Sequence, residues 1–231
     1  MAYMQRTVVA GRTMEIEKYL LCPKPHHRKG PRVNPTSEQM ERVNERNAKK
    51  KLRRLVNANF GAGDLHLVLT YRGMPPDPET AKENLKRFLR KMRKMYAASE
   101  REFKYIVTTE CKARRIHHHI IVNKADVNEI RKLWEHGILR LSVLDDTGDY
   151  HQLADYLIKE TSRTFREMPT GKRWTASRNL IRPKEKTKTV RRSKFRDPPP
   201  ESIGGYQLVR VERWADEWTG EVHQVGYYLR N

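Results

Sequence analysis

The 231-residue sequence contains only two cysteines, Cys22 and Cys111, which are too few for a disulfide framework and are typical of a reducing compartment. Cys22 is followed by His26 and His27, a combination that could indicate a zinc site. Because no second cysteine pair lies nearby, we interpret this stretch as a loop.

A long apolar run is also missing, so no segment is predicted to span a membrane. The opening residues, MAYMQRTVVAGR, have no apolar core long enough for a secretory signal peptide, and we therefore expect a cytoplasmic location. The sequence has no internal repeat. It also has no phosphate-binding loop of the helicase type, so any DNA unwinding would need another protein.

Acidic residues are in the minority. The 28 Asp and Glu residues face 48 Lys and Arg residues, which gives a formal net charge of +20. An excess of this size indicates a polyanionic partner and says nothing about the fold. Without an apolar segment, nucleic acid is the more natural partner than a membrane surface.

The central region, residues 61–183, is predicted to be the core domain. Strands are expected at 65–72, 103–110, 116–123 and 138–144, helices begin at Asp77 and Asp126 between them, and a further helix runs from Asp149 to about Met168. The order β-α-β-β-α-β predicts an α+β fold of the split βαβ, ferredoxin-like type. In that arrangement two helices cover one face of an antiparallel sheet and leave the other face free.

Two flanking regions surround this core. Residues 1–60 are predicted to form a hairpin around Gly11 and a basic helix from Thr36 to about Asn59, which looks too polar to join the core. Residues 184–231 are predicted to form a basic linker and a C-terminal β-hairpin, set apart by the segment DPPPESIGG. The hairpin could extend the sheet, bind duplex DNA or pair subunits.

Three consecutive histidines lie in the strand RIHHHIIV, whose side chains alternate between two faces. His118 shares the apolar side and is predicted to be a core histidine with hydrogen-bonded nitrogens. His117 and His119 share the other side and could reach one ion, with Glu110 of the preceding strand adding a carboxylate oxygen. Such a mixed set suits manganese, although imidazoles also favour zinc, iron or nickel and carboxylates magnesium. Non-haem iron oxygenases use the same trio, but nothing in so basic a chain favours that interpretation.

The helix after Asp149 carries a second candidate group. At about 100° per residue, Tyr156 and Lys159 lie away from the apolar stripe of Tyr150 and Leu157. A phenol beside a metal-held phosphate would be a nucleophile, and a nearby ammonium could stabilise the developing charge. The alternative is an amphipathic tyrosine packed on a basic stem.

Three motifs in this order resemble the HUH endonucleases, specifically the rolling-circle replication initiators with one catalytic tyrosine. They are LVLTY at 67–71, ECKARRIHHH at 110–119 and YLIK at 156–159, and the later segment KRWTASRNLIRP at 172–183 is similar to one in replication-associated proteins of phage and plasmid origin. One departure is His118, which occupies the central position where the family usually has a hydrophobic residue.

The resemblance implies that Glu110, His117 and His119 bind Mn²⁺ or Mg²⁺, that Tyr156 is the nucleophile and that Lys159 assists it. Tyr156 would cleave a specific phosphodiester in single-stranded DNA, leaving a covalent 5′-phosphotyrosine and a 3′-hydroxyl that primes synthesis. Reverse attack would rejoin the strands. The implied partners are single-stranded DNA at a replication origin and a host helicase and polymerase, in a bacterial cell carrying a phage or mobile element.

Further residues are candidates for nucleic-acid binding. The cations are Arg114, Arg115, Lys172, Arg173 and Arg178, and the stacking aromatics are Tyr71 and Trp174. For each, the alternative is a solvated basic face or a core aromatic. A different functional class also fits the composition: a non-catalytic DNA- or RNA-binding module that stacks bases on its free sheet face. Among enzymes, a relaxase or a single-tyrosine transposase would share the same site.

Overall fold

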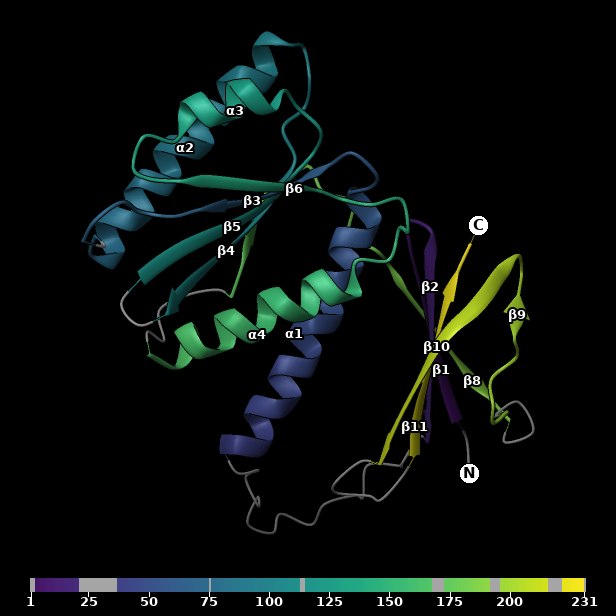
Figure 1. Ribbon diagram of the computed structural model, residues 1–231. Helices are drawn as coiled ribbons and strands as arrows, with labels where there is room; N and C mark the ends of the chain where they lie inside the picture. The colour runs from purple at the N-terminus through teal and green to yellow at the C-terminus, as the bar shows by residue number, and fades with distance from the viewer. Residues whose placement is uncertain are drawn as a thin grey trace. The chain divides into compact units, whose positions relative to one another are not determined.

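The computed structural model describes residues 3–20, 37–74, 76–112, 115–167, 173–191, 196–215 and 222–230. The chain divides into two compact units: residues 44–181 form a central unit, and residues 1–43 and 182–231 together form a terminal unit. Both contain antiparallel sheets, and the described residues include four helices (Figure 1). The predicted α+β class is therefore confirmed. Cys22, His26 and His27 lie outside the described residues.

The central unit is built on a five-stranded antiparallel sheet with the order β6-β3-β5-β4-β7. Its strands are β3 (Leu65–Leu69), β4 (Tyr105–Lys112), β5 (Arg115–Val122), β6 (Leu139–Val143) and β7 (Thr175–Ala176). The helices are α1 (Ser37–Asn59), α2 (Pro78–Ala98), α3 (Val127–Leu133) and α4 (His151–Glu167). The histidine strand β5 lies in the middle of the sheet, between β3 and β4.

Local signals explain where two of these helices begin. The Asp77 carboxylate accepts hydrogen bonds from the amides of Glu79 and Thr80, and Pro78 occupies the first turn of α2, where no amide donor is needed. Asp126 caps α3 in the same way. Both helix starts were predicted from the sequence.

Helix α3 ends at Leu133, earlier than the predicted end near Gly137. The chain instead returns along β3, where the amide of Thr70 donates to the carbonyl of Ile138 and that of Arg72 to the carbonyl of His136. A β-carbon at Gly137 would lie 2.2 Å from the carbonyl oxygen of Thr70. Only glycine permits this close approach of the two backbones.

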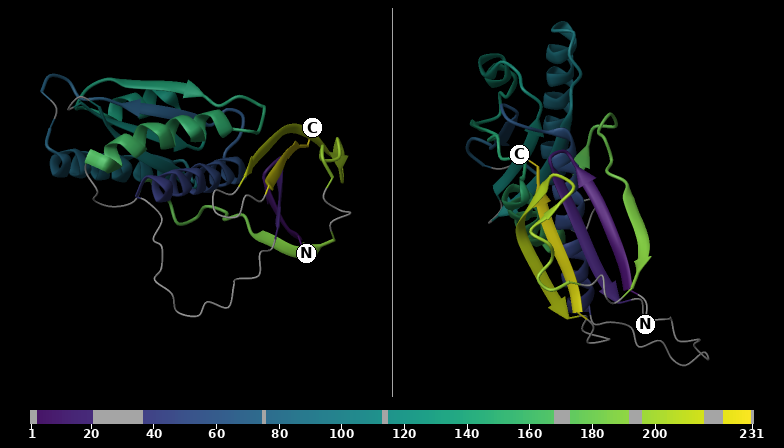
Figure 2. Two further views of the ribbon diagram at one scale, coloured as in Figure 1. Left: turned by 90° about the horizontal axis from the view of Figure 1, so that it is seen from below. Right: turned by 90° about the vertical axis from the view of Figure 1, so that its right-hand side faces the viewer.

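Helices cover both faces of the central sheet (Figures 1 and 2). On one face α2 and α3 pack over a core that includes Leu67, Phe88 and Ile120. On the other face α1 and α4 pack over a second core that includes Ile106 and Ile121. The prediction of a free second face is therefore wrong, because two further helices occupy it.

Helix α1 is the less expected of these two. Leu52 and Val56 are fully buried in the core of the second face, so the prediction of a polar flank is wrong. The side-chain amide of Asn57 also donates to Asp149, and its oxygen accepts from the amide of Tyr150, which ties α1 to the start of α4. A narrow apolar stripe is sufficient to dock a helix whose other positions are cationic.

Leu52→Ala is expected to lower the free energy of unfolding by about 2–5 kcal/mol, because it removes a fully buried side chain and leaves a cavity. Met40→Ala on the exposed side of the same helix is the control and should change stability by less than about 0.5 kcal/mol. Chemical denaturation measures both values, and equal stabilities of the two variants would contradict the docked position of α1.

The terminal unit is a six-stranded antiparallel sheet with the order β8-β1-β2-β11-β10-β9. Its strands are β1 (Tyr3–Ala10), β2 (Thr13–Leu20), β8 (Glu185–Val190), β9 (Ser202–Ile203), β10 (Tyr206–Ala215) and β11 (Val222–Leu229). The N-terminal hairpin turns at Gly11, which has a φ of 58°, and the predicted C-terminal hairpin is β10–β11. The two hairpins join through the pairing of β2 with β11. In the described part of the chain, no helix combines the length and apolar character needed to cross a membrane.

Candidate active site

Three of the predicted side chains meet on the face of the central sheet that α1 and α4 cover. Glu110 of β4 pairs directly with His117 of β5, and His119 follows two residues later on the same side. The Glu110 Oε2 atom lies 3.2 Å from His119 Nε2 and 3.8 Å from His117 Nδ1. Glu110 and His119 are each 4% exposed, whereas His117 is half-buried.

A fourth side chain, His66, joins this group and was missed in the sequence. Its Nε2 lies 3.3 Å from His119 Nδ1, and the two rings are stacked with centroids 5.5 Å apart. Burial, and then the charge of His119, lowers the pKa of His66 to about 4. Burial also lowers the pKa of His119, although Glu110 opposes this shift. Both rings are therefore neutral at pH 7 and keep a lone pair for an acceptor role or a ligand.

Helix α4 brings Tyr156 to the same place. The Tyr156 ring meets the His119 ring edge to face, with centroids 5.6 Å apart and an interplanar angle of 78°. Its side chain is 45% exposed, and Lys159 is exposed one turn later. Burial, and then the charges of Glu110 and Glu160, raises the pKa of the phenol, so that Tyr156 is protonated at neutral pH.

His118 has the interior role that its strand position predicts. Its Nδ1 lies 2.9 Å from Thr109 Oγ1 and its Nε2 lies 3.1 Å from the Tyr71 hydroxyl, so both nitrogens have partners. Burial, and then the charges of its two histidine neighbours, lowers its pKa to about 3. The prediction of a core histidine with hydrogen-bonded nitrogens is confirmed.

The donor types of Glu110, His117 and His119 suit a divalent cation. No group of three or more His, Cys, Asp or Glu side chains in the described residues forms a metal site as it stands. The separations of 3.2 and 3.8 Å are nevertheless close to the roughly 3 Å between neighbouring ligands of one ion with bonds of about 2.1 Å. The residues therefore fit a metal ion after a small adjustment of side chains.

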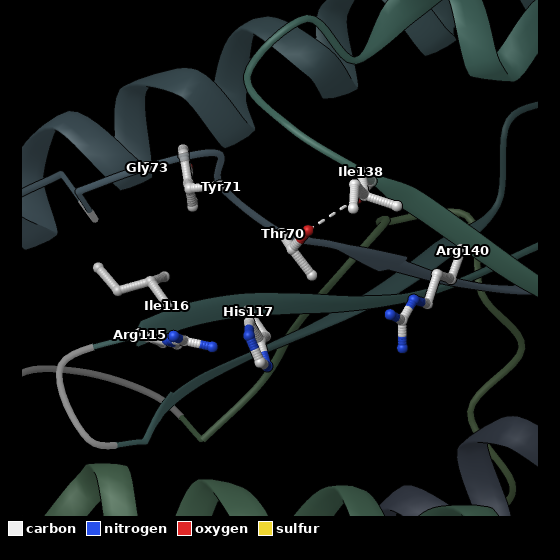
Figure 3. Close-up of a pocket in the computed structure, with 8 residues that line it drawn as sticks. All are labelled: Thr70, Tyr71, Gly73, Arg115, Ile116, His117, Ile138 and Arg140. Carbon is white, nitrogen blue, oxygen red and sulfur yellow. Dashed lines mark hydrogen bonds between the residues drawn. The ribbon is translucent and has the colours of Figure 1, made fainter.

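A cavity of about 560 Å³ lies beside His117 (Figure 3). It is lined by Thr70, Tyr71, Gly73, Arg115, Ile116, His117, Ile138 and Arg140. Arg140 of β6, which was not predicted, pairs with Val68 of β3, and Val68 pairs with His119. Directly paired residues share a face, so the strand register places Arg140 on the same side as the histidine pair.

The other predicted residues lie at different places. Tyr71 is on the face covered by α2 and α3, where its hydroxyl donates to the carbonyl of Ala81 and burial raises its pKa to about 12. Arg173 and Trp174 line a cavity of about 430 Å³ beside α1. The remaining predicted cations are Arg115, which is exposed in the cavity beside His117, Arg178, which is exposed after β7, and Arg114 and Lys172, which lie outside the described residues.

Comparison with known proteins agrees with this geometry. Residues 64–164 match a family model of replication-associated proteins, described as "Replication-associated protein ORF2" and related sequences. The match runs from just before β3 into α4 and so includes the histidine strand, Glu110 and Tyr156. No curated protein sequence matches the chain.

Proposed function

Because residues 64–164 match the replication-associated protein ORF2 family, we propose that the chain initiates rolling-circle replication as an HUH endonuclease with a single catalytic tyrosine. The observation that carries this proposal is the contact between the rings of Tyr156 and His119. It brings a potential nucleophile from α4 against the histidine that already contacts Glu110. The strand order β6-β3-β5-β4 supports the further proposal of a ferredoxin-like, split βαβ arrangement.

In the proposed reaction the Tyr156 hydroxyl oxygen forms a bond to the phosphorus of a phosphodiester in single-stranded DNA. The bond from phosphorus to the 3′-oxygen breaks, the phenol loses its proton and the 3′-oxygen gains one. The products are a 5′-phosphotyrosine and a free 3′-hydroxyl that primes synthesis. Attack by a 3′-hydroxyl on the phosphotyrosine reverses these steps and rejoins the strand without ATP. Lys159 binds the phosphate or stabilises charge on the tyrosine oxygen.

Glu110, His117 and His119 would hold the divalent cation, Mn²⁺ or Mg²⁺. When bound, such an ion withdraws charge from the phosphate oxygens and orients the scissile bond. His66 is then the partner of the second nitrogen of His119 and fixes the orientation of that ring.

His66→Phe is expected to weaken Mn²⁺ binding by about 10- to 100-fold, because His119 loses the partner that orients it. Isothermal titration with Mn²⁺ measures the effect, and thermal unfolding shows whether the fold is retained. His136→Phe, on an exposed histidine, is the control. Unchanged Mn²⁺ affinity in a folded His66→Phe protein would exclude this positioning role.

Cations beside the site are proposed to follow the DNA strand. Arg115 and Arg140 contribute to the cavity beside His117, and Arg173 and Trp174 contribute to the cavity beside α1. The other proposed contacts are Arg114, Lys172, Arg178 and Tyr71. Phosphate contacts of this kind make binding fall steeply with salt. The origin DNA, a host helicase and a host polymerase are the proposed partners, and the cytoplasm is the proposed location.

A non-catalytic DNA- or RNA-binding module is the main alternative. Such a module would stack bases on exposed aromatics of an open sheet face, whereas α1 and α4 cover the second face of this sheet. A relaxase or a single-tyrosine transposase would use the same residues on a different DNA substrate.

A nicking assay separates these classes. The protein is incubated with single-stranded oligonucleotides that tile the origin of the encoding element, with Mn²⁺ or with EDTA. We expect cleavage at one position with Mn²⁺ only, and rejoining when a second 3′-hydroxyl strand is added. Binding without cleavage at any position would favour the non-catalytic module. Cleavage confined to transfer-origin or transposon-end oligonucleotides would favour the other two enzymes.

A further inference from the structure

The sheet of the terminal unit carries a row of polar side chains that crosses five strands. The row consists of Lys188 on β8, Gln5 on β1, Lys18 on β2, Gln224 on β11 and Arg213 on β10, each directly paired with the next. Directly paired residues of antiparallel strands project to the same face, so these five side chains share one side of the sheet. Adjacent strands lie about 4.8 Å apart, which places the backbones of Lys188 and Lys18 roughly 10 Å from each other.

A cavity of about 590 Å³ opens over one end of this row. It is lined by Gln5, Lys18, Lys188, Thr189, Val190, Arg191, Arg196 and Pro200. Four of these side chains are cationic, and none of the described lining residues is acidic. Lys188, Arg191 and Arg196 are exposed, so their charged groups are accessible to a ligand.

Lys18 is the least expected member of this group. It is only 7% exposed, although lysine is rarely buried without a compensating charge. Burial, and then the positive charges of Arg196 and Lys188, lowers its pKa. A bound anion would offset both effects, because it adds a negative charge beside the buried ammonium.

The opposite face of the same sheet treats its cations differently. Arg6 lies 3.3 Å from a carboxylate oxygen of Glu17 and 3.3 Å from one of Glu185. Arg210 lies 2.7 Å from Glu212. The cations of that face are thus matched by carboxylates, whereas positive charges gather around the cavity.

We propose that this cavity is a second nucleic-acid contact, in which Lys18, Lys188, Arg191 and Arg196 bind phosphate groups of the DNA backbone. The site lies in the terminal unit, outside the residues proposed for cleavage. It rests on the proposed function only in taking DNA as the polyanion. Its role is to hold DNA that flanks the nick site, and it adds affinity without contacting the scissile bond.

The test uses the full-length protein with Tyr156→Phe and EDTA, so that cleavage does not interfere with binding. Fluorescence anisotropy measures affinity for a labelled duplex of about 30 base pairs, roughly two dsRNA- or dsDNA-binding footprints long, and for its single strand over a range of salt. The test variant is Lys188→Gln with Arg191→Gln. The matched control is Lys82→Gln with Lys86→Gln, which removes two exposed charges from α2, where they pair with Glu79 and Glu83.

The test variant should lose roughly tenfold in affinity for each phosphate contact removed near 0.1 M salt. The slope of log K against log salt should fall by about 0.9 for each contact, and the control should stay within about twofold of the parent. The form of DNA with the larger loss identifies the duplex or the single strand as the ligand. Equal losses in test and control, or no loss in either, would overturn the proposal.

Failure of this site and failure of the proposed nuclease are distinguishable. If the wild-type chain never cleaves DNA but the test variant still loses affinity and salt dependence, the second contact stands without the nuclease. If the chain cleaves but the test variant binds as tightly as its control, the nuclease stands without the second contact.

Discussion

Tyr156→Phe is expected to reduce DNA cleavage by at least about 10⁴-fold and to abolish the covalent adduct, while affinity for single-stranded DNA stays within about twofold. The substitution removes the only atom that can form the phosphotyrosine bond. It keeps the ring that packs against His119, so the local structure should be retained. Cleavage under single-turnover conditions and anisotropy with the same oligonucleotide measure the two effects.

Tyr150→Phe is the matched control, since it also removes one phenolic hydroxyl near α4. That hydroxyl donates to the carbonyl of Asp145, so its loss should cost about 1 kcal/mol of stability and leave cleavage intact. Cleavage by Tyr156→Phe at the wild-type rate would exclude Tyr156 as the nucleophile. A loss of the same size in both variants would point to a structural cause.

His119→Ala is expected to reduce Mn²⁺-dependent cleavage by about 10³-fold or more and to weaken Mn²⁺ binding. His119 is the central member of the candidate site, because Glu110, His66 and Tyr156 all contact its ring. Its removal deletes one proposed metal ligand and the surface against which the nucleophile packs. Cleavage is measured as a function of Mn²⁺ concentration, and metal binding by calorimetry.

His118→Leu provides the contrast from the adjacent position. It leaves Thr109 and Tyr71 without their histidine partner, so it should lower stability by about 1–3 kcal/mol. Because His118 faces the α2–α3 side of the sheet, Mn²⁺ affinity of the folded protein should not change. If His118→Leu lost metal binding and His119→Ala kept it, the assignment of ligands to the two faces would be reversed.

The features that could be predicted from the sequence depend on local chemistry. Asp77 and Asp126 are followed by helix-forming residues whose first amides need acceptors, so both helix starts are visible in a short window. Alternation along β5 placed His118 on the opposite face from His117 and His119, because the period of a strand does not depend on its neighbours.

The features that were missed depend on contacts distant in sequence. His66 and Arg140 join the site only through the pairings of β3 with β5 and of β6 with β3, and a register cannot be read from one strand alone. The composition of α1 is dominated by charge, which concealed the two fully buried positions, Leu52 and Val56. The pairing of β2 with β11 joins segments at opposite ends of the chain and has no local signal.

The intact mass of the protein after incubation with an origin oligonucleotide and Mn²⁺ tests the central claim most directly. We predict a species heavier than the protein by the mass of the 5′-phosphorylated cleavage fragment, with the DNA on the peptide that contains Tyr156. Cleaved DNA with the protein at its unmodified mass at all times, or an adduct on a different residue, would contradict the account.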